Sequence, residues 1–139
     1  MVVEIIIDEF KGQNIQVVAA IEARGFLFGM LIADALNVPF VPIRKFGKLP
    51  FKKMIEHYDL EYGTSSIEVH EDSIIPRSRV LIHDDLLATG GTATAAGQLM
   101  HRLGAKVTGF SFIINLSFLP GSVNLKSNFG VQGHSVITY

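Results

Sequence analysis

The sequence predicts an α/β fold with a parallel sheet flanked by helices. Short apolar runs rich in β-branched residues, typical of strands buried on both faces, occur at residues 15–21, 80–82 and 107–115. Between them, residues 26–36 and 94–103 have the mixed apolar pattern of helices. Strands that alternate with helical crossovers favour a parallel sheet.

The remaining elements are less regular. Residues 38–43 are expected to form a strand, and Pro39 and Pro42 suggest that it lies at an edge of the sheet or follows an irregular path. Apolar residues near the N-terminus predict a helix that ends near Gly12. Two short strands are expected at residues 66–70 and 136–139.

Residues 44–65 follow no clear helical or strand period and include Gly47, Pro50 and Gly63. An unpatterned stretch of about 20 residues inside a compact domain is usually a lid or binding loop, or is disordered. The chain shows no internal repeat, low-complexity tract or linker, so residues 1–139 are expected to form a single domain.

The composition excludes several classes of function. The 139 residues carry a net charge of −1 without a basic cluster, so a nucleic-acid partner is not expected. The chain has no cysteine, which excludes disulfides and thiolate metal sites and fits a reducing compartment, here the cytoplasm. Acidic residues interrupt the N-terminal apolar run, and no apolar stretch reaches the roughly 20 residues of a membrane span. We therefore expect no membrane partner.

Residues 80–94, with the sequence VLIHDDLLATGGTAT, carry the chemistry. A buried strand delivers Asp84 and Asp85 to the carboxyl edge of the sheet, where ligands bind in open α/β folds. The turn at residues 88–92 and the helix that follows offer N–H groups, hydroxyls and a favourable dipole to a phosphate. Adjacent carboxylates suit vicinal hydroxyls or a magnesium ion, so the segment predicts a ribose 5-phosphate site. Alternatively, the turn is only a tight connection with aspartates as helix caps.

The same segment resembles the phosphoribosyl pyrophosphate-binding motif of type I phosphoribosyltransferases, and its LLATGGT stretch resembles the adenine-specific branch. The resemblance runs from end to end in consistent order, which is more specific than any one motif. It implies a Rossmann-like parallel sheet flanked by helices, with a flexible lid loop. The other similar stretches are residues 22–29 (pyrophosphate loop), 41–50 (next strand and start of the lid), 58–64 (second half of the lid) and 112–116 (a later strand).

This resemblance implies a purine salvage transferase. Adenine and phosphoribosyl pyrophosphate would be converted to AMP and pyrophosphate by attack of adenine N9 on C1 of the ribose. Magnesium would bridge pyrophosphate and ribose oxygens near Asp84 and Asp85. The related enzymes are usually homodimers, so a second copy of the chain is an expected partner beside the substrates and products.

The family pattern also implies three groups of site residues. Ribose and its phosphate would contact Asp84, Asp85, Ala88, Thr89, Gly90, Gly91 and Thr92. Pyrophosphate would contact Glu22, Ala23, Arg24, Arg44 and Lys48, with a cis peptide bond between Glu22 and Ala23. The implied catalytic residues are Arg24 at the leaving group, Glu61 for proton handling on adenine and Tyr62 as a shield against water.

Simpler interpretations stay open for the charged residues. On spacing alone, Arg44, Lys45 and Lys48 form a solvated loop face, and Glu61 is an ordinary exposed glutamate. Arg24 lies between a buried strand and an apolar helix, where an unpaired charge is costly. It is therefore expected to need an anion, either a ligand or a structural acid.

The sequence departs from the family pattern at two points. His83 stands where an aliphatic residue is common, and a satisfied structural histidine is expected there. The N-terminal hood over adenine is largely absent, and a missing segment of about forty residues would expose apolar surface. Three functions therefore stay open: a working adenine phosphoribosyltransferase, a weak or inactive module that binds phosphoribosyl pyrophosphate or AMP, and a related enzyme for xanthine or hypoxanthine. The LLATGGT stretch and residues 60–63 disfavour the third.

Overall fold

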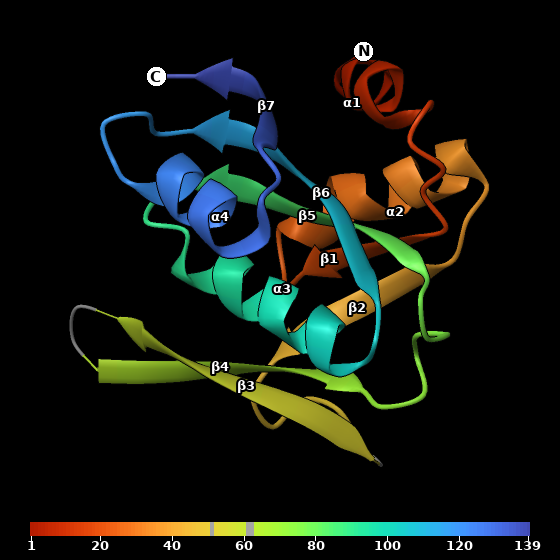
Figure 1. Ribbon diagram of the computed structural model, residues 1–139, viewed down its shortest axis with the longest axis vertical. Coiled ribbons are helices and arrows are strands. Elements are labelled where there is room, and N and C mark those ends of the chain that lie inside the picture. Colours follow the sequence, from red (N-terminus) through yellow and green to blue (C-terminus); the bar gives the residue numbers. More distant parts are fainter. Residues whose placement is uncertain (51, 61–62) are drawn as a thin grey trace.

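The computed structural model describes residues 1–50, 52–60 and 63–139. Within these residues the chain forms a seven-stranded sheet and four helices (Figure 1). The strands are β1 (Val17–Ile21), β2 (Phe40–Lys45), β3 (Lys53–Leu60), β4 (Gly63–His70), β5 (Arg79–Leu87), β6 (Lys106–Asn115) and β7 (Gly133–Thr138). The helices are α1 (Val2–Phe10), α2 (Gly25–Leu36), α3 (Gly91–Arg102) and α4 (Gly121–Phe129).

The central part of the sheet is parallel, as predicted. The strand order is β3-β4-β2-β1-β5-β6-β7, and each neighbouring pair from β2 to β7 is parallel. Every residue of β1 is buried, which explains its unbroken apolar sequence. Because parallel strands end at the same edge of a sheet, the carboxyl ends of β1, β2 and β5 lie side by side.

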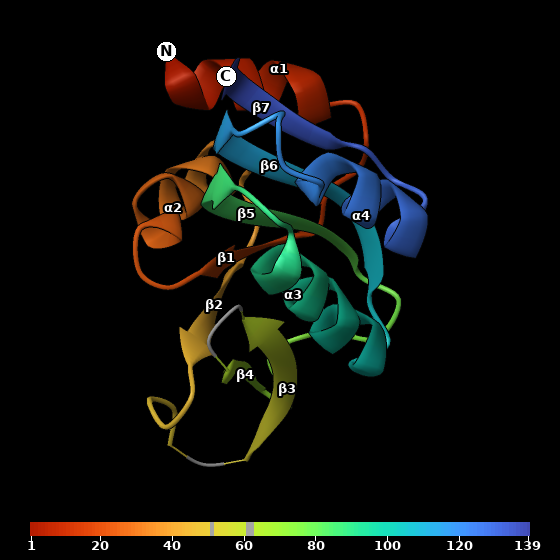
Figure 2. The same ribbon diagram turned by 90° about the vertical axis from the view of Figure 1, so that its left-hand side faces the viewer.

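Helices cover both faces of this sheet. Side chains alternate along β1, so that Val17, Ala19 and Ile21 join the core cluster beneath α3 and α4. Val18 and Leu81 belong to the second cluster, beneath α1 and α2. Figure 2 shows α1 and α2 on one side of the sheet and α3 and α4 on the other. None of the helices in the described part of the chain is long and apolar enough to cross a membrane.

The position of β2 corrects the expectation that the strand lies at an edge. β2 lies between β1 and β4, and its residues from Phe40 to Ile43 pair with β1. In the described residues, its ladder to β4 involves Arg44 and Lys45. Pro42 therefore precedes the segment that pairs on both sides, which is why a residue without an N–H group is tolerated here.

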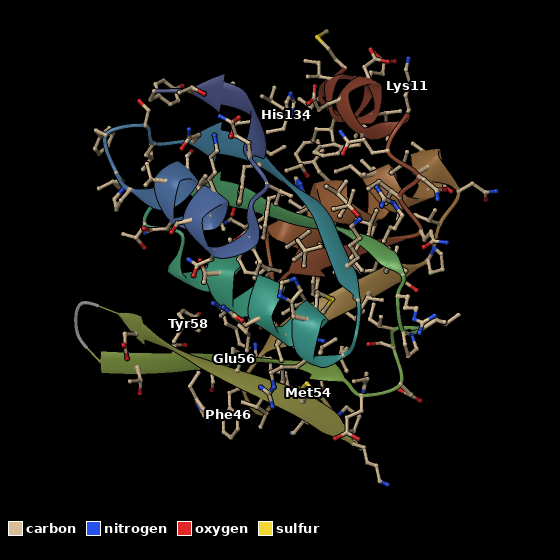
Figure 3. All side chains as sticks on the ribbon, in the orientation of Figure 1. Lys11, Phe46, Met54, Glu56, Tyr58 and His134 are labelled. Carbon is tan, nitrogen blue, oxygen red and sulfur yellow. The ribbon has the colours of Figure 1, made fainter. Side chains whose placement is uncertain are left out.

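An antiparallel hairpin occupies much of the stretch that was expected to have no period. β3 and β4 pair in register from Lys53 opposite His70 to Leu60 opposite Gly63. The hairpin packs against α3, and β4 joins it to the parallel strands through β2 (Figure 1). Glu56 and Tyr58 point from it toward α3, whereas Phe46 lies on the opposite side (Figure 3). The inward face of β3 thus includes polar residues, which hid its alternation in the sequence.

The helix α4 was not predicted from the sequence. The predicted end of the strand before the phosphate turn and the predicted start of the helix after it were also too far apart. Residues 121–129 bury Gly121 and Leu125 and are otherwise mostly polar, so their periodicity is weak. β5 continues through both aspartates to Leu87, and α3 begins at Gly91. The connection between strand and helix is therefore shorter than expected.

Candidate active site

A cleft of about 400 Å³ opens at the carboxyl edge of the sheet, where β1 and β5 end and α3 begins. Ten of the twelve residues predicted to bind ribose phosphate or pyrophosphate line it; Arg44 and Lys48 are the other two. The lining also includes residues that were not predicted as site residues. The complete lining is Ile21, Glu22, Ala23, Arg24, Lys45, Asp84, Asp85, Leu86, Leu87, Ala88, Thr89, Gly90, Gly91, Thr92 and Ala93.

The phosphate turn, residues 88–92, joins β5 to α3. Gly90 has φ +87°, a conformation that side chains rarely adopt, and a Cβ atom there would lie 3.2 Å from the Gly121 backbone. No side-chain cap is present at the start of α3 in the described part of the chain, so its first N–H groups stay available to a ligand. With the hydroxyls of Thr89 and Thr92, they form a site suited to an anion.

The acid pair, Asp84 and Asp85, lies at the carboxyl end of β5. The Asp85 backbone N–H donates a hydrogen bond to Asp84 Oδ1 at 2.8 Å. Burial raises the pKa of Asp84 to about 7, and the neighbouring carboxylate of Asp85 adds to this effect. The Asp84 carboxyl therefore ionises near neutral pH.

His83 is fully buried in the middle of this strand. Its Nδ1 atom lies 2.8 Å from Ser111 Oγ on β6. Its Nε2 atom is buried without a hydrogen-bond partner among the described residues. Burial lowers the pKa of His83 to about 4, so the ring is neutral. The burial of His83 confirms the expectation of a structural histidine. The expectation that both ring nitrogens are satisfied is not met, because only Nδ1 has a hydrogen-bond partner among the described residues.

The cation corner, formed by Arg24, Arg44 and Lys48, lies beside the acid pair. Arg24 Nε is 2.9 Å from Asp85 Oδ2. Arg44 Nε forms a short ion pair with Glu22 Oε2, and Lys48 Nζ lies 3.2 Å from Glu22 Oε1. Burial of Glu22 opposes ionisation, but Arg44 and Lys48 hold its pKa below the ordinary value. All three cations therefore have carboxylate partners from the chain itself.

Arg24 differs from the sequence-based expectation in its surroundings. The Arg24 side chain is 76% exposed, so it does not lie in the apolar environment that its flanking residues suggested. Its predicted need for an anion is met by the structural acid Asp85. The peptide bond between Glu22 and Ala23 is cis, as the resemblance implied.

Lys45 is a cleft residue that the sequence interpretation left on the loop face. It lines the cleft from the end of β2, and its Nζ donates a hydrogen bond to Tyr58 Oη at 3.2 Å. Burial of Tyr58 opposes ionisation, but contacts with Thr92, Ser65 and Lys45 hold its pKa below the ordinary value. Its role could have been predicted from its position, because Lys45 ends a strand adjacent to β1 in a parallel sheet, and ligands bind at that edge.

The two lid residues implied for catalysis, Glu61 and Tyr62, lie outside the described residues. The neighbouring part of the hairpin reaches the phosphate turn. A Cβ atom added to Gly91 would lie 3.8 Å from both the Tyr58 ring and the Asp59 carbonyl oxygen. The hairpin in this conformation therefore borders the cleft at the start of α3.

The comparison with known proteins agrees with this geometry. Residues 2–118 match the family described as phosphoribosyl transferase domain. The chain is 54% identical over 112 residues to the adenine phosphoribosyltransferase of Myxococcus xanthus, which covers 81% of this chain and 61% of that protein. It is 47% identical over 137 residues to the adenine phosphoribosyltransferase of Pseudoalteromonas atlantica, covering 99% of this chain and 76% of that protein.

A solved structure shows the same fold. The crystal structure of adenine phosphoribosyltransferase from Thermoanaerobacter pseudethanolicus superposes with a TM-score of 0.94 at 43% identity, covering 99% of this chain and 78% of that one. The parallel sheet, the phosphate turn and the acid pair define a type I phosphoribosyltransferase fold. Within that class, the chain belongs to the adenine phosphoribosyltransferase family.

Proposed function

We propose that the chain is a purine salvage transferase that converts adenine and phosphoribosyl pyrophosphate to AMP and pyrophosphate. The cleft carries this proposal, because the phosphate turn, the acid pair and Arg24 line it, and Arg44 and Lys48 pair with Glu22 in its wall. The first two suit a ribose 5-phosphate, and the third suits an anionic leaving group. The name that the relatives share supports adenine as the acceptor.

Each group of site residues would bind a different part of phosphoribosyl pyrophosphate. N–H groups and hydroxyls of residues 88–92 hold the 5-phosphate, and the acid pair accepts hydrogen bonds from the ribose hydroxyls. Negative charge grows on the departing pyrophosphate as its bond to C1 breaks, so cations stabilise the transition state there. Arg24, which pairs with Asp85, and Arg44 and Lys48, which pair with Glu22, would supply these cations.

Magnesium fits the donor set of this cleft as a cation that arrives with the substrate. The described residues contain no group of three or more His, Cys, Asp or Glu side chains that would hold a metal by themselves. Mg²⁺ commonly binds one or two carboxylates together with substrate phosphate oxygens, and Asp84 and Asp85 are suited to that role. Bound there, it would neutralise charge on the pyrophosphate.

The hairpin is proposed to act as the lid of a single domain comprising residues 1–139. The contact of Tyr58 on the hairpin with Thr92 of the phosphate turn supports this role. Glu61 would handle the proton on adenine and Tyr62 would exclude water.

Homodimer formation is proposed through the outer face of α2. Leu27, Met30 and Leu31 are 69%, 58% and 53% exposed and share one face of the helix. An apolar stripe of this kind is typical of a surface that another copy covers. Sedimentation of the chain as a monomer at micromolar concentration would contradict this part of the proposal. The proposed location is the cytoplasm, where purine bases and phosphoribosyl pyrophosphate are metabolised.

A direct assay tests the activity. The chain is incubated with magnesium, phosphoribosyl pyrophosphate and either adenine, hypoxanthine or xanthine, and nucleotide and pyrophosphate are measured. We expect AMP and pyrophosphate from adenine. Binding of phosphoribosyl pyrophosphate or AMP without turnover would instead indicate a binding module, and product from the other purines would indicate a different acceptor.

A further inference from the structure

The carboxylate of Glu22 occupies the position between two cations that the proposed function assigns to pyrophosphate. Arg44 Nε pairs with one of its oxygens and Lys48 Nζ, at 3.2 Å, with the other. Both cations reach Glu22 from β2 and the segment after it. The Glu22 carboxylate therefore bridges Arg44 and Lys48, as an anionic ligand would.

Glu22 is built into the cleft wall rather than free to move away. Its side chain is 7% exposed, whereas those of Arg44 and Lys48 are 33% and 54% exposed. Its backbone N–H donates to the Ile43 carbonyl at 2.9 Å, which fixes it against β2. A ligand that draws the cations into the cleft therefore leaves a nearly buried carboxylate with weakened pairing, and such a charge is costly.

This cost depends on the charge of the ligand. A pyrophosphate has two phosphoryl groups and can pair with Arg44 and Lys48 simultaneously. An orthophosphate offers one group and less charge, so it draws fewer of the two cations away from Glu22. The carboxylate therefore lowers the affinity for both anions and lowers the affinity for pyrophosphate more.

We propose that Glu22 sets the affinity of the site for its leaving group: it acts as an internal counter-anion that holds Arg44 and Lys48 and that a diphosphate must displace from both cations, a monophosphate from fewer. The inference rests on the proposed function, which places pyrophosphate at these cations. It adds that the affinity for the leaving group is set by competition with a carboxylate of the chain. In the opposite account, Glu22 only positions Arg44 for the ligand.

The two accounts predict opposite signs for Glu22→Gln. Isothermal titration with pyrophosphate and with orthophosphate measures both affinities without turnover. Competition predicts that the Kd for pyrophosphate falls about three- to tenfold, as expected for losing partly buried ion pairs. The Kd for orthophosphate falls less, so the preference for pyrophosphate over orthophosphate widens. A Kd for pyrophosphate that is unchanged or higher would overturn the inference.

Two further variants separate competition from charge and folding effects. Glu71→Gln makes the same change of net charge at an exposed turn outside the cleft, and its anion affinities should match those of the wild type. Glu22→Asp keeps the charge but is shorter by one methylene, so it pairs less well with both cations. Competition predicts a smaller tightening for this variant, and the positioning account predicts weakening.

The outcome is distinguishable from failure of the proposed function. If AMP is not formed but Glu22→Gln binds both anions more tightly, the competition stands and the assigned reaction fails. If AMP is formed but the variant binds pyrophosphate no better, the reaction stands and the competition is wrong.

Discussion

The phosphate turn lines the cleft and the cation corner adjoins it through Asp85 and Glu22, but the two regions are suited to anions in different ways. The turn has no charged side chain and depends on backbone geometry at Gly90 and on the start of α3. The corner has three charged side chains, each paired with a carboxylate of the chain. The turn is therefore preformed, whereas the corner must exchange partners when it binds an anion.

This difference matches what each region is proposed to do. The 5-phosphate stays bound throughout the reaction, so a rigid site with little reorganisation suits it. The pyrophosphate must be stabilised as it leaves and must then depart, so a site with competing internal anions suits it better. Variants that act on one region should therefore leave the other measurably intact.

The largest effect is expected from Gly90→Ala. The alanine residue would have to keep a positive φ, which is unfavourable for a residue with a side chain. Its Cβ atom would also lie 3.2 Å from the Gly121 backbone, so the turn and α4 have to move apart. We expect the Kd for ribose 5-phosphate to rise on the order of 100-fold, as for a displaced binding geometry. Isothermal titration of ribose 5-phosphate measures this change, with pyrophosphate affinity altered far less.

Gly130→Ala is the matched control. Gly130 also has a positive φ, but no atom lies within 4 Å of the position of its Cβ. This variant should lose about 1 kcal/mol of stability without a change in either affinity. Equal losses of ribose 5-phosphate binding in both variants would show that backbone strain, and not the close approach to α4, governs the turn.

A smaller, pH-dependent effect is expected at the acid pair. The pKa of Asp84 is about 7 because of burial and the adjacent Asp85, so its carboxylate becomes ionised between pH 6 and 8. The affinity for ribose 5-phosphate should rise about tenfold over this interval in the wild type, in step with the ionised fraction. Asp84→Asn should show only the change due to the ligand phosphate, which both proteins share.

The same shift affects stability with a defined sign. The pKa of Asp84 is raised in the folded state, so its contribution to stability is present at low pH and is lost as the pH rises through about 7. Asp84→Asn should therefore melt about 4 °C above the wild type at pH 8, with a smaller difference at pH 5. A constant difference across this range would mean that Asp84 is ionised throughout.

The sequence predicted the preformed region more completely than the exchangeable one. The residues of the phosphate turn and the acid pair are contiguous, so one apolar strand and one glycine-rich turn were sufficient to indicate their site. The corner brings together Glu22, Arg44 and Lys48 through the parallel pairing of β1 and β2. Its ion pairs depend on three-dimensional register, which spacing along the chain does not encode.

Two features that the sequence did not predict, the place of Lys45 in the cleft and the β3–β4 hairpin, have a similar physical origin. Lys45 lines the cleft because β2 ends beside β1, whereas its sequence neighbours resemble a solvated loop. The hairpin escaped detection because β3 packs on α3 with the mixed residues Met54, Glu56 and Tyr58, whose alternation is not a simple apolar pattern. Fold class was predictable from buried parallel strands, because these are hydrophobic regardless of function.

The smallest effect is expected from loosening the hairpin, which borders both regions. Arg102 Nη1 on α3 donates to the Ile55 carbonyl at 2.6 Å and to Glu56 Oε1 at 3.1 Å. Arg102→Gln removes this attachment; because the pair is partly exposed, the cost should stay below about 1 kcal/mol. Hydrogen exchange of β3 amides should accelerate about two- to fivefold.

Arg102→Gln is also expected to affect ligand binding in the two regions differently. Tyr58 of the hairpin contacts both Lys45, on the same strand as Arg44, and Thr92 of the turn. The turn, however, is held mainly by β5, α3 and Gly121. Arg102→Gln should therefore raise the Kd for pyrophosphate about twofold and leave that for ribose 5-phosphate unchanged. Lys11→Gln, which breaks a remote surface pair with Asp8, is the control. Equal weakening of both ligands by Arg102→Gln would mean that the hairpin also supports the turn, and the turn could then no longer be regarded as preformed.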